Sequence, residues 1–137
     1  MLLSGTQTGG ASEVGRHYVE FGAEPPSGNR ITVCRAYTCK MQTPYTFSQK
    51  DLAEIRAVMA KTKKADTAAE ERRAVAYAIA HIDVKIGAKL GIKDKAGMQF
   101  FASGNPEQLD CVDVATNTTS CLLSCSRTAC SNITPWR

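Results

Sequence analysis

The chain has 137 residues, which is enough for one folded domain with a modest core. Its hydrophobic fraction of 43% and charged fraction of 22% are typical of a globular protein and exclude a wholly disordered chain. No apolar run of about 18 residues occurs, so we expect no membrane span. The net charge of +4 comes from 17 basic residues scattered among 13 acidic ones, a pattern that does not indicate nucleic-acid binding.

Residues 1–28 carry clusters of Gly, Ser, Thr and Pro and only one short apolar stretch, around Tyr18, Val19 and Phe21. This composition predicts a loosely held, flexible N-terminal arm. No secretory signal is recognisable, because the first three residues are followed by polar ones rather than by a long apolar run. Two interpretations stay open: a cytoplasmic chain, or a start placed downstream of the true one.

Two extended segments follow the arm. In residues 30–37, Ile31 and Val33 alternate with polar or small side chains, a pattern typical of a β-strand. A second strand is expected over residues 40–47, where Pro44 restricts it to a sheet edge or a bend.

Cys34 and Cys39 lie at the end of the first predicted strand. A turn over residues 35–38 would bring their Cα atoms within the distance that a disulfide allows. Such a disulfide would indicate an oxidising compartment. The alternative of two reduced thiols is equally open from the sequence.

A first amphipathic helix is predicted over residues 49–62. Ser48 is suited to its N-cap, and Asp51 stands where the partner in a capping box would be. Its apolar residues fall close to one helical face: Leu52, Ile55, Val58 and Met59.

A second amphipathic helix is predicted over about 67–90. Thr67 and Glu70 have the spacing of a capping box, and Gly91 is well placed to end the helix. Apolar residues that recur at spacings of three and four are expected to bury one face: Val75, Ile79, Ile82, Ile86 and Leu90.

The two histidines are expected to have structural roles. His17 lies in the predicted arm, and His81 lies at the border of the apolar stripe of the second helix. Neither has neighbours at ligand spacing, so no metal site and no cofactor are predicted.

Cys111 follows the turn signal Gly104-Asn105-Pro106 and precedes a stretch with helical potential, LDCVDVATNTTS. We therefore expect a third helix beginning near Cys111, with the thiol in its first turn. The N–H groups and the positive dipole end there would stabilise a thiolate nucleophile and an oxyanion. The alternative is that Cys111 is a small buried apolar residue.

The residues Asp110, Cys111, Asp113 and Ala115 form the segment Asp-Cys-x-Asp-x-Ala. This segment resembles the nucleophile segment of bacterial transglutaminase-like cysteine peptidases, in which a Cys opens a helix and is followed by an acidic and a small residue. Together, TVCRAYTCK at 32–40 and LDCVDVATNTTS at 109–120 are similar to a group of uncharacterised proteobacterial proteins. The resemblance implies that Cys111 is the candidate nucleophile of a thiol enzyme acting on a peptide or protein substrate.

The sequence departs from the family pattern after the nucleophile. Transglutaminase-like enzymes place their His and then their Asp downstream of the Cys, where the imidazole accepts the thiol proton. No His follows Cys111 in this sequence. We therefore expect the chain as given to be inactive.

Residues 121–137, CLLSCSRTACSNITPWR, read as an atypical Cys-, Ser- and Thr-rich tail in which no apolar stripe continues past Leu122 and Leu123. One explanation is a change of reading frame at codon 120, since permitted codons allow another frame with an apolar helix end, an Asn-Gly stop and a strand containing a His. The other is that Cys121, Cys125 and Cys130 are genuine, although their spacing does not match a standard zinc pattern.

These elements predict an α+β fold: a small antiparallel sheet, two amphipathic helices and a third helix starting near Cys111. A single domain over 29–120 would lie between the arm 1–28 and the tail 121–137. Two functions are open: the N-terminal part of a transglutaminase-like or papain-like cysteine hydrolase or acyltransferase, or a non-enzymatic envelope or interaction domain in which Cys111 is structural. A periplasmic or secreted location is expected, with the cytoplasm as the alternative.

Overall fold

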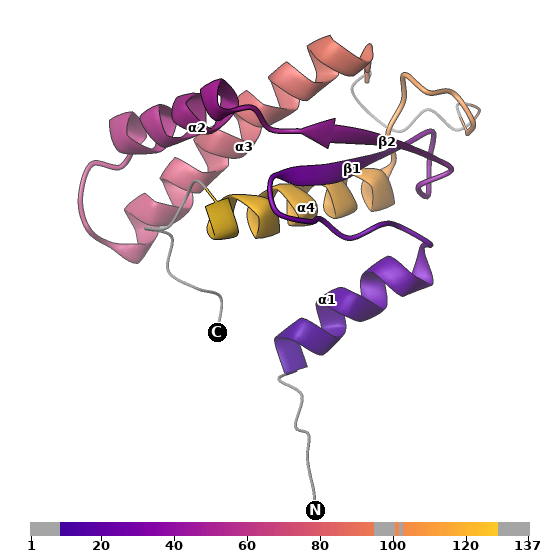
Figure 1. The fold of residues 1–137 in the computed structure, drawn as a ribbon, viewed down its shortest axis with the longest axis horizontal. Helices are drawn as coiled ribbons and strands as arrows, with labels where there is room; N and C mark the ends of the chain where they lie inside the picture. Colours follow the sequence, from indigo (N-terminus) through magenta and orange to yellow (C-terminus); the bar gives the residue numbers. More distant parts are fainter. Residues whose placement is uncertain (1–8, 95–100, 102, 129–137) are drawn as a thin grey trace, which may run out of the picture.

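The computed structural model describes residues 9–94, 101 and 103–128. In this part of the chain, four helices surround a two-stranded antiparallel sheet, and the predicted α+β class is confirmed (Figure 1). The elements follow the order α1 (Gly9–Glu20), β1 (Arg30–Arg35), β2 (Met41–Thr46), α2 (Gln49–Thr62), α3 (Ala68–Leu90) and α4 (Cys111–Thr128).

The sheet pairs β1 with β2 from Arg30 opposite Thr46 to Arg35 opposite Met41. Strand β1 ends two residues earlier than predicted because the chain turns into a left-handed conformation after Arg35. Pro44 stands on an edge strand, as expected for a residue that has no N–H to donate to a ladder.

Helix α2 begins and ends where the sequence predicts. Ser48 accepts a hydrogen bond from the N–H of Asp51, and the Asp51 carboxylate accepts one from the N–H of Ser48, which completes the capping box. The two capping residues are three positions apart, so this helix start could be predicted from the sequence directly.

Helix α3 also has the predicted length. The Thr67 hydroxyl accepts from the N–H of Glu70, but the Glu70 carboxylate accepts from the N–H of Lys64 instead of completing a capping box. Gly91 ends the helix with a φ angle of 71°, a left-handed conformation that suits glycine.

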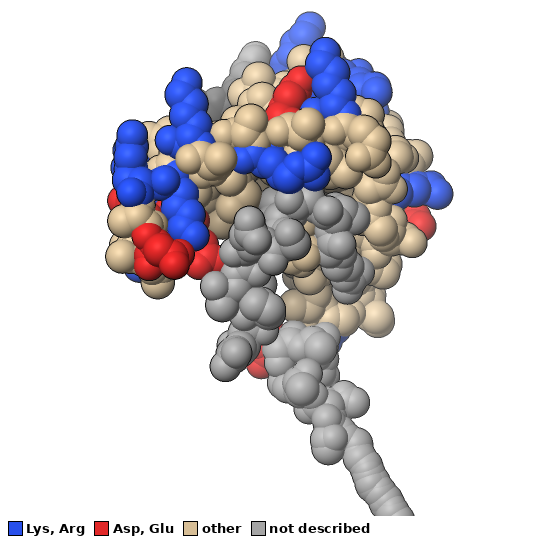
Figure 2. Space-filling model, turned by 60° about the vertical axis from the view of Figure 1, so that its left-hand side comes forward, with Lys and Arg blue, Asp and Glu red and all other residues tan. Residues whose placement is uncertain are grey.

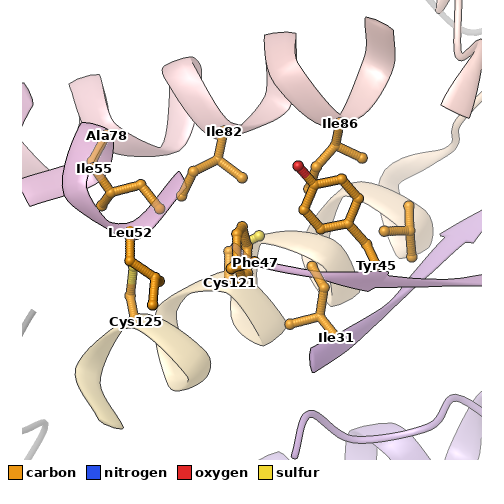
Figure 3. Close-up of a cluster of buried hydrophobic side chains, with 11 residues drawn as sticks. Ile31, Tyr45, Phe47, Leu52, Ile55, Ala78, Ile82, Ile86, Cys121 and Cys125 are labelled. Atoms are coloured by element: carbon orange, nitrogen blue, oxygen red, sulfur yellow. The ribbon is translucent and has the colours of Figure 1, made fainter. Parts of the chain in front are cut away.

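The main core lies between the sheet, α2, α3 and one side of α4 (Figure 3). The buried face of α3 differs from the face predicted from the sequence. Val75 and Ile79 are only half-buried, whereas Ala74 and Ala78 are buried. Small side chains at these positions let α2 and α3 lie close together. The buried residues of this core are Ile31, Val33, Tyr45, Phe47, Leu52, Ile55, Ala78, Ile82, Ile86, Cys121 and Cys125.

Residues 9–20 form helix α1, whereas the sequence suggested a loosely held arm over 1–28. Tyr18 is buried, and its hydroxyl lies 2.8 Å from the Ser120 hydroxyl on α4. Tyr18 also packs into a second apolar cluster with Ala23, with Cys34 near the end of β1 and with Cys39 in the turn after it. The composition of residues 1–28 did not reveal this helix, because its anchors lie about a hundred residues later in the chain.

Helix α4 continues to Thr128, past the point where the sequence suggested a break in helical pattern. Cys121 and Cys125 lie on the face toward the main core, where they behave as small apolar residues. The predicted tail 121–137 therefore begins as an ordinary packed helix. Cys130 lies outside the described residues.

Charged side chains are mixed over the surface. On the face drawn in Figure 2, Lys and Arg side chains are spread widely, with acidic side chains among them. None of the helices in the described part of the chain is both long and apolar enough to cross a membrane.

Candidate functional site

The N-terminus of α4 is held by two carboxylates in a reciprocal arrangement. The Asp110 carboxylate accepts a hydrogen bond from the N–H of Asp113 at 2.9 Å, and the Asp113 carboxylate accepts one from the N–H of Asp110 at 3.1 Å. Asp110 is thus the cap of α4, and Cys111 is its first residue, as predicted. The Cys111 side chain is exposed, so the alternative of a buried apolar cysteine is wrong.

The turn after β1 has an unusual backbone. Ala36, Tyr37, Thr38 and Cys39 have φ angles of 68°, 70°, 49° and 57°, although none of them is glycine. A left-handed conformation costs an L-residue roughly 1–2 kcal/mol, so the surrounding structure must compensate. We call residues 36–39 the left-handed turn.

Every N–H of the left-handed turn donates to residues just before or within α4. Tyr37 and Cys39 each donate to the Asp113 carboxylate at 2.8 Å. Thr38 donates to the Asp110 carboxylate at 2.9 Å, and Ala36 donates to the carbonyl oxygen of residue 108 at 2.9 Å. Successive left-handed residues form a concave array of N–H groups that binds anions, and here the bound anion is the side chain of Asp113.

Asp113 is fully buried. Its burial raises its pKa above the usual value, and the neighbouring Asp110 carboxylate adds to this effect, while the backbone N–H donors oppose it. A carboxylate in such a position has a structural role, because both of its oxygens are already engaged by the backbone.

Cys34 and Cys39 close the left-handed turn with a disulfide, and their Cα atoms are 4.4 Å apart. Their pairing, one of the two alternatives that the sequence left open, is thus the one that the geometry favours. Both cysteines are buried, as is Asp113, and the possible ligand atoms of the three lie within 4.8 Å of one another. Bonded sulfurs and a carboxylate occupied by N–H donors are poor metal ligands, so this cluster is better explained as a structural unit.

Farther along α4, polar side chains continue to bind the backbone. The Asn117 amide accepts from the N–H of Cys34 at 2.7 Å and donates to its carbonyl oxygen at 2.9 Å, which saturates this part of the free edge of β1. Ser124 donates to the carbonyl oxygen of Gly28 at 2.7 Å. The residues on this polar docking face of α4 are Asp113, Thr116, Asn117, Ser120 and Ser124, all of them buried.

The polar docking face was not predicted from the sequence. A signal was present, because the polar residues at 113, 117, 120 and 124 recur at spacings of four, three and four, which is the periodicity of one helical face. Cys111 precedes Ser120 by nine residues, which is roughly half a turn around the helix, so its thiol lies on the opposite side. The candidate nucleophile and the polar docking face are therefore separate features of α4.

The two histidines lie away from the thiol. The His17 Nε2 atom is 2.7 Å from the Thr116 hydroxyl, on the polar docking face. His81 pairs with Glu54 at 3.3 Å between α3 and α2. Within the described residues, neither imidazole is hydrogen-bonded to Cys111.

The other free cysteines of α4 differ sharply from Cys111. Cys121 and Cys125 are buried in the main core. Burial raises the pKa of Cys121 to about 12, and the negative charge of Asp83 adds to this effect. At neutral pH this thiol therefore stays protonated and unreactive.

A groove with a volume of about 260 Å³ lies between α3 and α4. Apolar side chains such as Val114 and Leu109 line it together with two carboxylates, Asp83 and Asp94. Cys111 is not among its lining residues.

Comparison with known proteins adds no relative: no protein-family model, no curated protein and no solved structure matches this chain.

Proposed function

We propose that this domain presents Cys111 as the thiol of a transglutaminase-like or papain-like cysteine hydrolase or acyltransferase, in a form that lacks the catalytic base. The observation that carries the proposal is the placement of Cys111: it is exposed and it is the first residue of an 18-residue helix that packs along the sheet. The N–H of Asp113 is bound by the Asp110 carboxylate and that of Val114 by the Asp110 carbonyl oxygen, so the N–H groups of Cys111 and Val112 are the ones offered to an oxyanion.

The rigidity of the Cys111 backbone supports the same proposal. The paired carboxylates of Asp110 and Asp113 hold the residues on both sides of Cys111 and bind the left-handed turn as well. A nucleophile is most effective on a backbone that is already fixed in position. The two acidic residues of the Asp-Cys-x-Asp segment therefore have a positioning role in this proposal, and neither acts on a substrate.

Turnover still requires a proton acceptor and donor for the thiol and the leaving group. His17 and His81 are engaged elsewhere, and no histidine follows Cys111 in the sequence. We therefore expect no amide hydrolysis or acyl transfer by these 137 residues alone. Turnover that is abolished in Cys111→Ala would contradict this expectation.

A second candidate is a non-enzymatic interaction domain, and the groove between α3 and α4 favours it. This groove combines apolar side chains with two carboxylates, and Cys111 does not line it. In this case the exposed thiol would have no chemical role.

The rate of thiol labelling distinguishes the two candidates. Iodoacetamide should modify Cys111 at neutral pH about tenfold faster than a cysteine placed one turn later on the same face, by Ala115→Cys in a Cys111→Ala background. Ala115 is also exposed, so the two thiols differ mainly in their distance from the helix terminus. Equal rates, measured by mass spectrometry, would refute a nucleophilic role and favour the interaction domain.

The Cys34–Cys39 disulfide supports a periplasmic or secreted location, because such bonds persist mainly in oxidising compartments. Mass spectrometry of a non-reduced digest would test this. Free thiols at both positions in protein isolated from the periplasm would remove the argument.

A further inference from the structure

Hydrogen bonds join the left-handed turn after β1 to the first turn of α4. We propose that the Cys34–Cys39 disulfide is a redox-sensitive latch that holds this end of α4 in place. The proposal goes beyond the chemistry of Cys111 and does not require Cys111 to be a nucleophile. In this proposal, the oxidation state of Cys34 and Cys39 controls the position of the first turn of α4.

The backbone of the turn cannot hold its conformation without help. Four consecutive L-residues have positive φ angles, and each is intrinsically disfavoured there. The disulfide ties the last of these residues, Cys39, to Cys34 at the end of β1. Reduction removes this tie and leaves the hydrogen bonds and the packing of the second apolar cluster to oppose relaxation of the turn.

Relaxation of the turn would directly affect Asp113. This carboxylate has no exposed surface, and of the three N–H groups that donate to it, those of Tyr37 and Cys39 belong to the turn. If both are lost, a buried carboxylate keeps a single donor, which is strongly unfavourable. The first turn of α4 would then move toward water, and the bond between Thr38 and Asp110 would break with it.

The rest of α4 has anchors that do not depend on the turn. Cys121 and Cys125 pack in the main core, and Ser124 binds Gly28 in the segment before β1. Reduction of the disulfide should therefore loosen only residues 35–40 and 110–116.

The reaction balances with a dithiol as the reductant. A thiolate of the dithiol attacks Sγ of Cys39, which forms a mixed disulfide and releases Cys34 as a thiolate. The second thiol of the reductant then attacks the mixed disulfide, which releases Cys39 and leaves the reductant as a cyclic disulfide. Two electrons and two protons pass from the dithiol to the two cysteines.

Because Cys34 and Cys39 are 0% and 4% exposed, the reductant reaches them only when the turn opens. The rate of reduction therefore reports how tightly Asp113 and Asp110 hold the turn. Coupling of this kind is reciprocal: a change that weakens the carboxylate contacts also raises the equilibrium population of the open turn.

Hydrogen exchange of the full chain tests the latch. Oxidised protein is compared with protein kept reduced by dithiothreitol and with the double variant Cys34→Ser, Cys39→Ser. Amides in 35–40 and 110–116 should exchange about tenfold faster in both reduced forms, the change expected for the loss of one charged hydrogen bond. Amides in α2 and α3 should be unchanged.

A second measurement follows the rate at which dithiothreitol reduces the disulfide. Asp113→Asn should accelerate reduction about tenfold. Asp110→Asn should accelerate it to a smaller extent, and this variant is the one to measure if Asp113→Asn folds poorly. Asp66→Asn, at an almost fully exposed position between α2 and α3, is the control and should react like the parent.

Two outcomes would overturn the proposal. Equal exchange of residues 110–116 in the oxidised and reduced forms would mean that the disulfide does not control α4. Loss of protection throughout α2 and α3 on reduction would mean that the disulfide stabilises the whole domain and not this helix end.

Discussion

Asn117 joins helix α4 to strand β1 through both ends of its amide group. It accepts from the N–H and donates to the carbonyl oxygen of Cys34, and all of these groups are buried. Asn117→Ala should lower the free energy of unfolding by about 2–3 kcal/mol, because two buried backbone groups lose their partner.

Urea denaturation would measure this loss. Thr118→Ala is the matched control, since Thr118 is adjacent, half-buried and, like Asn117, borders the groove, but it does not hold the backbone of Cys34. A similar loss in both variants would mean that the Asn117 contacts contribute no more than ordinary packing.

In the folded state, the residues of the Asp-Cys-x-Asp segment have two different roles. Asp110 and Asp113 bind backbone N–H groups, whereas Cys111 faces water. The sequence showed that the segment is unusual, but it could not show which of its residues hold the fold. That distinction depends on residues 36–39, which are more than seventy positions away.

At the scale of elements, helices α2 and α3 were predicted well because their ends are encoded by neighbouring residues. Ser48 and Thr67 cap the starts, and Gly91 ends α3 in a left-handed conformation. Which residues of α3 are most buried was predicted less well, because this depends on how closely α2 approaches.

Substitutions in α3 should reflect this difference in burial. Ile82 is 2% exposed within the main core (Figure 3), whereas Ile79 is only partly buried and packs against this core. Ile82→Ala should cost about 2–4 kcal/mol of unfolding free energy and Ile79→Ala clearly less. Thermal or urea unfolding would compare them, and an equal or larger cost at Ile79 would contradict this packing.

A polar contact also joins α2 to α3 beside the core. The Lys85 ammonium lies 2.7 Å from the Asp51 carboxylate. Burial of Asp51 opposes its ionisation, but hydrogen bonds from Lys85 and Ser48 outweigh this and lower its pKa to about 2.

This lowered pKa predicts how stability depends on pH. A carboxyl group whose pKa is lower in the folded state stabilises the protein above its unfolded pKa, near 3.8, and the stabilisation disappears as the pH falls toward 2. Asp51→Asn should therefore be less stable than the parent at pH 6, by on the order of 1 kcal/mol, and the difference should shrink below pH 4. A difference that is constant from pH 6 to pH 2 would exclude this origin.

At the scale of the whole molecule, α4 lies between two apolar clusters. One side contributes Cys121 and Cys125 to the main core, and the other contributes Val112 and Leu123 to the cluster around Tyr18 and the disulfide. The chain is therefore assembled around α4, with α1 covering the side that the sheet and α3 leave open (Figure 1).

Tyr18 tests this arrangement. Tyr18→Ala should cost about 3 kcal/mol of unfolding free energy and speed reduction of the disulfide, because the side chain that covers Cys34 and Cys39 is removed. Tyr18→Phe keeps the ring and loses the hydroxyl that bonds to Ser120, so it should cost about 1 kcal/mol and leave the rate of reduction close to that of the parent. Identical stabilities of the two variants would mean that α1 does not pack against α4 in this way.

The sequence by itself determined the features that neighbouring residues encode: the ends of α2 and α3, the edge position of Pro44, and the start of α4 at Cys111. Only the tertiary structure decided that residues 9–20 form a helix, that Cys121 and Cys125 fill a core, and that Asp113 and Asn117 bind the backbone around Cys34. The physical reason is that these features depend on hydrogen bonds and packing between segments some seventy to a hundred residues apart, whose partners exist only once the chain has folded.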